Sequence, residues 1–183
     1  MPATQQIKPS PARLAGLTPY TPPAPDPSID LRLDANEGAP TSVAILDALR
    51  ELSPDDLARY PDADALERAI ADVHNVDPSR VVITNGGDDA IDRIARATLE
   101  PGRTALLHTP TFVMIERAAR LAGGKITTVP WPDGDFPTDD FTSAITDDTA
   151  LLALVTPNNP TGCVIPTDVI CAIIECASAV GAI

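Results

Sequence analysis

The run Ala150-Leu151-Leu152-Ala153-Leu154-Val155 leads directly into Thr156-Pro157-Asn158-Asn159-Pro160-Thr161-Gly162, and this junction decides the fold. The unbroken apolar run predicts a strand buried on both faces, as in a parallel sheet. Prolines bracket the following loop, and its adjacent asparagines are neutral hydrogen-bond donors that a rigid loop can hold at a strand end. Loops of this type also occur without a function, so residues elsewhere in the chain must indicate whether this loop binds a ligand.

Strand and helix patterns alternate on the amino-terminal side of this junction. Apolar, β-branched runs predict strands over 80–84, 104–108, 126–129 and 150–155. Apolar residues at helical spacing predict helices from 41 to before Pro54, over 63–74, over 91–99, over 111–122, near 139–145 and from Pro166 onward. This alternation requires crossover connections, and it predicts an α/β fold whose mostly parallel sheet is covered by helices on both faces.

The first part of the chain has a different composition. Residues 1–28 hold eight of the 20 prolines, which oppose both helix and central strand and favour an extended arm. We therefore expect an N-terminal arm over 1–40 and a sheet-containing domain over 41–183.

Charge and composition exclude several classes of partner. The chain has 13 Lys and Arg against 26 Asp and Glu, a net charge of -13, which argues against nucleic acid or an anionic membrane as partner. The start of the chain has neither the basic nor the apolar region of a secretory signal, so a cytoplasmic protein is expected. Three cysteines without Cys-x-x-Cys spacing and two histidines predict no disulfide framework and no metal site.

Ligands bind parallel sheets at the carboxyl ends of the strands, so the residues after each predicted strand are the candidate site. After Thr84 comes Asn85-Gly86-Gly87-Asp88-Asp89, whose glycines allow a tight turn that exposes backbone N–H groups at a helix N-terminus. Such a turn binds phosphate without a basic side chain. The alternative is a plain strand-to-helix turn with Asp88 as a first-turn acid.

After His108 comes Thr109-Pro110-Thr111-Phe112, which places an aromatic ring just beyond a strand end. Phe112 is either a platform for a flat ligand or an ordinary core residue.

Together these loops resemble the N-terminal half of a fold-type I, pyridoxal-phosphate-dependent aminotransferase of class I/II. Leu33-Asp34-Ala35-Asn36-Glu37 and the Asn159-Pro160-Thr161-Gly162 loop fit that family in order and spacing. Leu17-Thr18-Pro19-Tyr20 and Arg59-Tyr60-Pro61-Asp62 favour its histidinol-phosphate branch. The resemblance covers nearly the whole chain. It implies a three-layer, aspartate aminotransferase-like sheet, incomplete here, and transamination of histidinol phosphate with 2-oxoglutarate in histidine biosynthesis.

The resemblance also implies roles for residues at the strand ends. Gly87, Asp88 and Asp89 match the loop that holds the phosphate of pyridoxal 5'-phosphate. The family usually has serine in place of Gly87 and glutamate in place of Asp89, so backbone donors must suffice. Phe112 matches the aromatic residue, commonly tyrosine, that stacks on the pyridine ring. Asn159 matches the asparagine that hydrogen-bonds the phenolic oxygen of that ring.

Three further matches lie nearer the N-terminus. Tyr60 matches a tyrosine that reaches the cofactor phosphate of the neighbouring subunit, which implies a homodimer. Tyr20 and Asn36 match positions near the substrate, an amino acid or amino-alcohol phosphate. For each of these three residues a surface or packing role is an equal alternative.

The lysine content limits what this chain does alone. Aminotransferases need a Schiff-base lysine and an acid facing the pyridine nitrogen, and in the family both follow the Asn-Pro-Thr-Gly loop. Only Lys8 and Lys125 occur here, one in the arm and one at the beginning of a predicted strand. No catalytic residue is therefore assigned. We expect a truncated form, inactive alone, that is a homodimer or complements a missing C-terminal half.

Two other functions stay open. The chain can be a non-catalytic interaction or binding module that keeps the fold of these pyridoxal-phosphate enzymes. It can also be an unrelated doubly wound nucleotide-binding protein, although a full G-x-G-x-x-G or Walker pattern is lacking.

Overall fold

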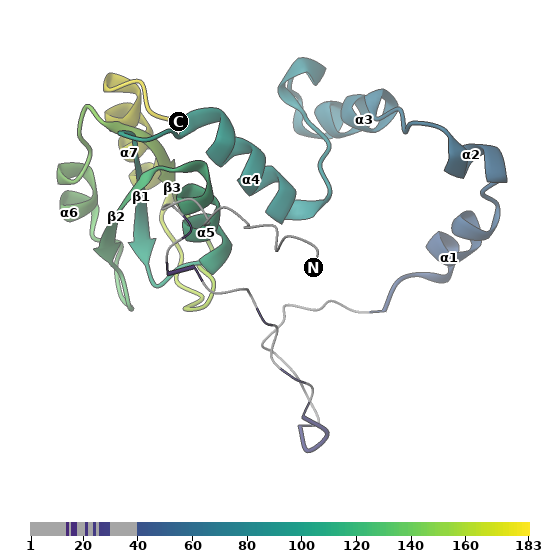
Figure 1. The fold of residues 1–183 in the computed structure, drawn as a ribbon, viewed down its shortest axis with the longest axis horizontal. Coiled ribbons are helices and arrows are strands. Elements are labelled where there is room, and N and C mark those ends of the chain that lie inside the picture. Colours follow the sequence, from purple (N-terminus) through teal and green to yellow (C-terminus); the bar gives the residue numbers. More distant parts are fainter. Residues whose placement is uncertain (1–13, 15, 18–20, 22–23, 25, 30–39) are drawn as a thin grey trace, which may run out of the picture. The chain divides into compact units, whose positions relative to one another are not determined.

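The structure is a computed structural model that describes residues 14, 16–17, 21, 24, 26–29 and 40–183. These residues divide into two compact units (Figure 1). The larger unit contains Thr84–Ile183, and the smaller unit contains the helices that precede it, up to Ile83. The expected arm over 1–40 lies largely outside the described residues, and the limits 1–40 and 41–183 stay predictions.

A parallel sheet forms the centre of the larger unit. Its strands are β1 (Thr104–Thr109), β2 (Lys125–Pro130) and β3 (Thr149–Ala153), in the order β2-β1-β3. β1 pairs with β2 from Thr104 opposite Lys125 to Thr109 opposite Pro130, and it pairs with β3 on its other side. Three predicted strands and their parallel arrangement are confirmed, although β3 ends before the predicted limit of 155.

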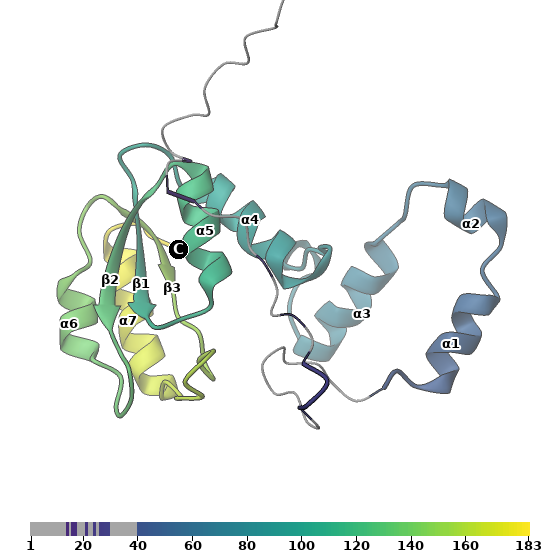
Figure 2. The same ribbon diagram turned by 60° about the horizontal axis from the view of Figure 1, so that its bottom comes forward.

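Helices cover both faces of this sheet (Figure 2). They are α4 (Gly86–Thr98) and α5 (Val113–Ala122) on one face, and α6 (Thr138–Ser143) and α7 (Thr167–Ala179) on the other. Side chains of β1 alternate between them: Ala105 and Leu107 pack with α4 and α5, whereas Leu106 packs with α6 and α7. The three-layer α/β architecture expected from the sequence is confirmed.

The outer edge of β3 is paired with the last residue of the chain. Ile183 donates its N–H to the carbonyl oxygen of Ala150 at 3.1 Å, and its own carbonyl accepts the N–H of Leu152 at 2.8 Å. This is the bonding pattern of a parallel pair, although Ile183 itself belongs to no strand.

The predicted strand over 80–84 is wrong. The structure has a 3-10 turn, η2 (Pro78–Arg80), and the residues from Val81 to Thr84 belong to no strand. The β-branched run does favour extended backbone, and Val81 is extended. A strand also needs a partner edge, and here the N–H of Ile83 donates instead to the Glu67 carboxylate at 3.1 Å.

The smaller unit is helical. Besides η2 it contains α1 (Val43–Arg50), α2 (Pro54–Ala58) and α3 (Asp64–His74), and Asn75 ends α3 in the left-handed conformation with φ 52°. The predicted helices over 41–53 and 63–74 are confirmed. Neither α1 nor α2 has a buried residue, and the apolar side chains of α1 are exposed.

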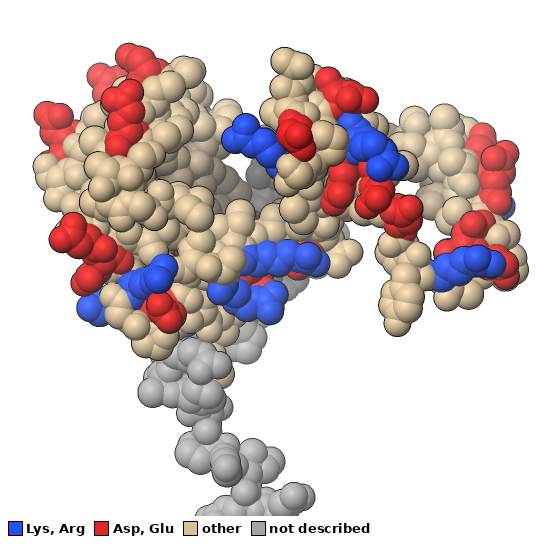
Figure 3. Space-filling model, turned by 90° about the horizontal axis from the view of Figure 1, so that it is seen from above, with Lys and Arg blue, Asp and Glu red and all other residues tan. Residues whose placement is uncertain are grey.

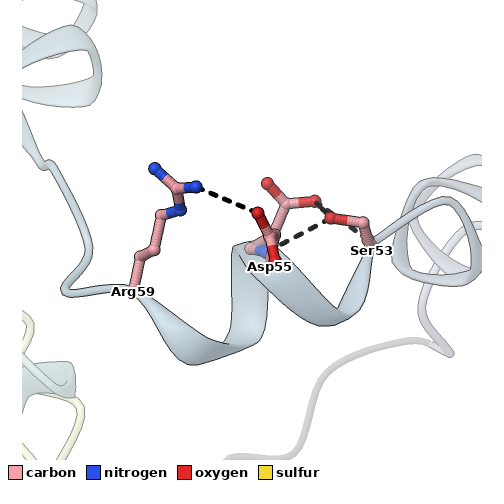
Figure 4. A network of polar contacts seen from close by, with 4 residues as sticks. Ser53, Asp55 and Arg59 are labelled. Carbon is pink, nitrogen blue, oxygen red and sulfur yellow. Dashed lines mark hydrogen bonds and ion pairs between the residues drawn. The ribbon is translucent and has the colours of Figure 1, made fainter.

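Helix α2 lies outside the helices predicted from the sequence, although its N-terminus carries a capping signal. Ser53 accepts the N–H of Asp56 at 3.2 Å, and the Asp56 carboxylate accepts the N–H of Ser53 at 2.8 Å. Pro54 occupies the first helical position, and Arg59 pairs with Asp55 at 2.9 Å (Figure 4). A Ser-Pro-x-Asp sequence therefore starts this short helix.

Arginines of the described residues pair mainly with nearby acids. Seven ion pairs join an arginine to an acidic residue three or four positions away, and Figure 3 shows blue side chains beside red ones. These pairs are exposed and local, so they support individual helices and turns rather than the arrangement of the sheet.

Candidate functional site

The first candidate segment forms the N-terminus of α4. Gly86 has φ +77°, and a Cβ added to Gly86 or Gly87 would meet nothing within 4 Å. No hydrogen bond joins the N–H of Gly87 or Asp88 to another described residue. The first turn of α4 thus presents free backbone donors. Free donors and the helix dipole together favour an anion.

Asp89 shapes this turn from within. Its carboxylate accepts the backbone N–H of Asn85 at 2.9 Å and the Nε–H of Arg93 at 3.0 Å. The hydrogen bonds from Arg93 and then from Asn85 lower the pKa of Asp89. Asp89 therefore stays charged and holds the turn in place, whereas Asp88 is exposed.

The second candidate segment follows β1. Phe112 is the N-cap residue of α5, with extended backbone, and its partly buried side chain packs against the core formed by α4, α5 and the sheet. A pocket of about 160 Å³ lies in the same region, lined in part by His108, Pro110 and Thr111. Phe112 thus packs against this core and keeps part of its side chain accessible.

The third candidate segment follows β3 and is organised by Asn158. This residue is only 3% exposed. Its side-chain Nδ2 donates to the carbonyl oxygen of Pro110 at 3.0 Å and to Oγ1 of Thr161 at 2.8 Å. The loop after β3 is therefore tied directly to the loop after β1.

Asn159 contrasts with its neighbour. It is half-buried, and its side-chain amide makes no hydrogen bond with the described residues. Because Asn158 and Pro110 join the two loops, Asn159 and Phe112 are carried by loops that contact each other. The structure thus brings two of the sequence-predicted site residues into one region.

His108 makes a second link between the same strand ends. Its side chain is fully buried, and Nε2 accepts the backbone N–H of Val155 at 3.1 Å. The ring lies edge-on to Trp131 and Phe136, at centroid distances of 5.1 and 6.0 Å. Burial lowers the pKa of His108, and a backbone interaction with Pro110 partly opposes this effect. The ring is therefore held neutral, as an acceptor at Nε2 must be.

The sequence predicts Asn158 as a hydrogen-bond donor of the loop and His108 as the end of a strand, and it predicts no linking role for either. Their partners lie 48 and 47 residues away in sequence. The sequence feature that could have indicated these roles is a polar residue at the end of an otherwise apolar strand.

Three further predicted site residues do not belong to the described part of the larger unit. Tyr60 belongs to the smaller unit, where its side chain is fully exposed. Tyr20 and Asn36 lie outside the described residues. Lys125 is the first residue of β2 and therefore lies at the amino end of the sheet, as predicted, while Lys8 is also outside the described residues.

Three buried polar atoms lack hydrogen-bond partners among the described residues: His108 Nδ1, Thr111 Oγ1 and Asn158 Oδ1. Buried polar atoms are almost always paired, so each calls for an explanation. All three belong to the end of β1 and to the two loops that Asn158 joins. Unused hydrogen-bonding capacity is thus concentrated at the candidate site.

Comparison with known proteins identifies the family. Residues 28–183 match the family model for aminotransferase class I and II. The chain belongs to this family. Aminotransferases of this class imply pyridoxal 5'-phosphate as cofactor. Free N–H groups at the start of α4 are groups of the kind that bind a phosphate, and the Phe112 ring and the unused amide of Asn159 are groups of the kind that contact an aromatic ring.

Curated relatives of the chain are named histidinol-phosphate aminotransferase. The protein of Erythrobacter litoralis is 36% identical over 146 residues, which cover 75% of this chain and 38% of the relative. That of Roseiflexus castenholzii is 35% identical over 167 residues, covering 81% of this chain and 45% of the relative. The chain thus spans less than half the length of these relatives.

Solved aminotransferase structures share the fold. N-succinyldiaminopimelate aminotransferase from Mycobacterium tuberculosis matches with a TM-score of 0.68 and 30% identity, over 81% of this chain and 42% of that one. Aspartate aminotransferase from Thermus thermophilus matches with a TM-score of 0.67 and 27% identity, over 75% and 39%. The aspartate aminotransferase-like fold is confirmed. Within the described part of the chain, no helix is long and apolar enough to span a membrane.

Proposed function

We propose that this chain supplies the cofactor-binding N-terminal part of a pyridoxal-phosphate-dependent aminotransferase that converts histidinol phosphate with 2-oxoglutarate. The observation that carries the proposal is the hydrogen bond from Asn158 to Pro110, because it brings the loops of Phe112 and Asn159 together at the end of the sheet. The names of the relatives support the substrate, and the family supports the cofactor.

The phosphate would be held at the first turn of α4. Backbone N–H groups of Gly87 and Asp88 are free to donate, and Asp89 keeps the turn closed through Asn85. A chain with a net charge of -13 repels an anion at long range, so binding must depend on these short-range donors.

The aromatic ring of the cofactor would lie against Phe112, with the side-chain amide of Asn159 donating to its phenolic oxygen. Bound pyridoxal phosphate supplies an electron sink for chemistry at the substrate carbon next to the amine. Phe112 orients the ring by packing, and Asn159 stabilises the charged form of the phenolic oxygen.

The remaining parts of the proposal concern the assembled enzyme. Tyr60 of one chain would reach the cofactor phosphate of a second copy, and Tyr20 and Asn36 would lie near the substrate. The working form would be a cytoplasmic homodimer.

Titration of the purified chain with pyridoxal 5'-phosphate tests the proposal. Trp131 is the one tryptophan of the sequence and packs in the core that contacts His108, so its quenching reports binding. We expect saturable binding that Asn159→Ala weakens about tenfold, the value of a hydrogen bond to a charged oxygen.

Ser178→Ala, an exposed change on α7, is the matched control and should bind as the unaltered chain does. Saturable binding of an adenine nucleotide, with none of pyridoxal phosphate, would instead indicate a nucleotide-binding protein.

A further inference from the structure

We propose that Asn158 is a positioning residue, which sets the place of Asn159 relative to Phe112 without contacting the cofactor itself. This inference rests on the proposed function of the site, and it gives Asn158 and Asn159 different roles. Asn159 would recognise the phenolic oxygen, whereas Asn158 would hold both cofactor loops in one arrangement.

The first step concerns the loop after β3. The backbone N–H of Asn158 donates to the carbonyl oxygen of Cys163 at 2.8 Å, and its carbonyl accepts the N–H of Gly162 at 2.6 Å. Gly162 has φ +75°, which lets the chain turn back at that point. Asn158 therefore closes the loop at its base, and the backbone of Asn159 is the next residue inside the closed turn.

The second step concerns the contact between the loops. Both protons of the Asn158 amide are used, one on the Pro110 carbonyl and one on Thr161 Oγ1. Pro110 is two residues before Phe112 in sequence. The Asn158 amide therefore bonds both to the loop that carries Phe112 and to the loop that carries Asn158 itself. The side chain is nearly inaccessible to water, which shields both hydrogen bonds from competition.

The third step separates positioning from folding. His108 joins the same strand ends through the N–H of Val155, and Asn158 belongs to a loop rather than to a strand or helix. Loss of the Asn158 amide should therefore leave the sheet intact while freeing the two loops from each other. Asn159 would keep its side-chain amide, but that amide would no longer be held in one position relative to Phe112.

The test compares two ligands, pyridoxal 5'-phosphate and its analogue without the 3-hydroxyl group, on the full chain. The unaltered chain should prefer the hydroxylated ligand about tenfold. Asn159→Ala and Asn158→Leu should each abolish that preference, and the double variant should lose nothing more. Ser178→Ala should retain the preference. A folded Asn158→Leu chain that keeps the preference would overturn the inference.

A ligand-free measurement separates this inference from the proposed function. Amide hydrogen exchange by NMR should become faster in both loops, 109–112 and 159–162, when Asn158 is replaced by leucine. Faster exchange in one loop alone would contradict a shared link. If the unaltered chain binds neither ligand, the proposed function fails. The exchange measurement then still tests whether Asn158 links the two loops.

Should Asn158→Leu fail to fold, Asn158→Asp removes the same two donors from a side chain of the same shape. It should give the same loss of ligand preference and the same faster exchange in both loops. Retention of the ligand preference in a folded Asn158→Asp chain would count equally against the inference.

Discussion

Nε2 of His108 accepts the backbone N–H of Val155 at 3.1 Å, which joins the central strand of the sheet to the chain leaving β3. The acceptor must be unprotonated for this bond to form. The side chain has no exposed surface, and its aromatic neighbours Trp131 and Phe136 offer no charge to stabilise an imidazolium ion. Protonation of His108 therefore destabilises the folded state of the larger unit.

The first prediction is a loss of stability in mild acid. Burial lowers the pKa of His108 below its ordinary value of 6.5, so the unfolded chain binds a proton at a higher pH than the folded chain does. The contribution of His108 to stability is complete above about pH 6.5 and falls as the pH drops from there toward the lowered pKa. Thermal melts between pH 5 and 7.5 should show this slope.

Substitution distinguishes the contributions of the two histidines of the chain to the pH dependence of stability. His108→Gln should flatten the pH dependence in that range, because glutamine does not titrate. His74 is exposed in the last turn of α3, and His74→Gln is the matched control that should leave the slope unchanged. An equal slope in His108→Gln and the unaltered chain would refute the assignment to His108.

The second prediction concerns the core beneath α6 and α7. Leu106 has no exposed surface and packs in the cluster that contains Phe141 and Ile173. Leu106→Ala should lower the free energy of unfolding by about 2–5 kcal/mol, since it leaves a cavity in a packed core. Urea denaturation measures this. Leu57→Ala, at a side chain that is 75% exposed, should change stability by no more than about 0.5 kcal/mol.

The sequence predicted this sheet well because each strand carries its own signal. The apolar runs that became β1 and β3 are buried on both faces, and that burial produces the pattern. The run before Asn85 carries a similar signal but finds no partner edge, and a partner is not a property of the run itself. Residue patterns predict extended backbone more directly than they predict pairing.

The candidate site was predicted in part for a related reason. Phe112 and Asn159 could be selected because each lies in a loop after a predicted strand and matches a position of the family that the chain resembles. The roles of Asn158 and His108 depend on bonds to Pro110 and Val155, nearly fifty residues away, and those partners are known only once β1 and β3 lie side by side. Local pattern therefore indicates which loops form the site, and the tertiary fold determines which residues hold it together.

The third prediction concerns Lys125. It begins β2, at the opposite end of the sheet from the loops of Phe112 and Asn159, so it cannot reach a ligand bound there. Borohydride reduction of the chain with pyridoxal 5'-phosphate, followed by peptide mass spectrometry, should show no stoichiometric labelling of Lys125. Lys125→Arg should leave the non-covalent affinity unchanged. Full labelling of Lys125 that a competing cofactor analogue prevents would place the site at the other end of the sheet.

The last prediction uses the two adjacent glycines at the start of α4. Gly87 lacks positive φ and has open space where a side chain would lie, and the family usually has serine there. Gly87→Ser should therefore fold normally and add a hydroxyl donor, raising the affinity for pyridoxal 5'-phosphate about three- to tenfold. Gly86→Ser is the matched control, because φ +77° strains any side chain at that position. It should lower the melting temperature and weaken binding. Equal effects of the two substitutions in calorimetric titration would show that the first turn of α4 does not hold the phosphate.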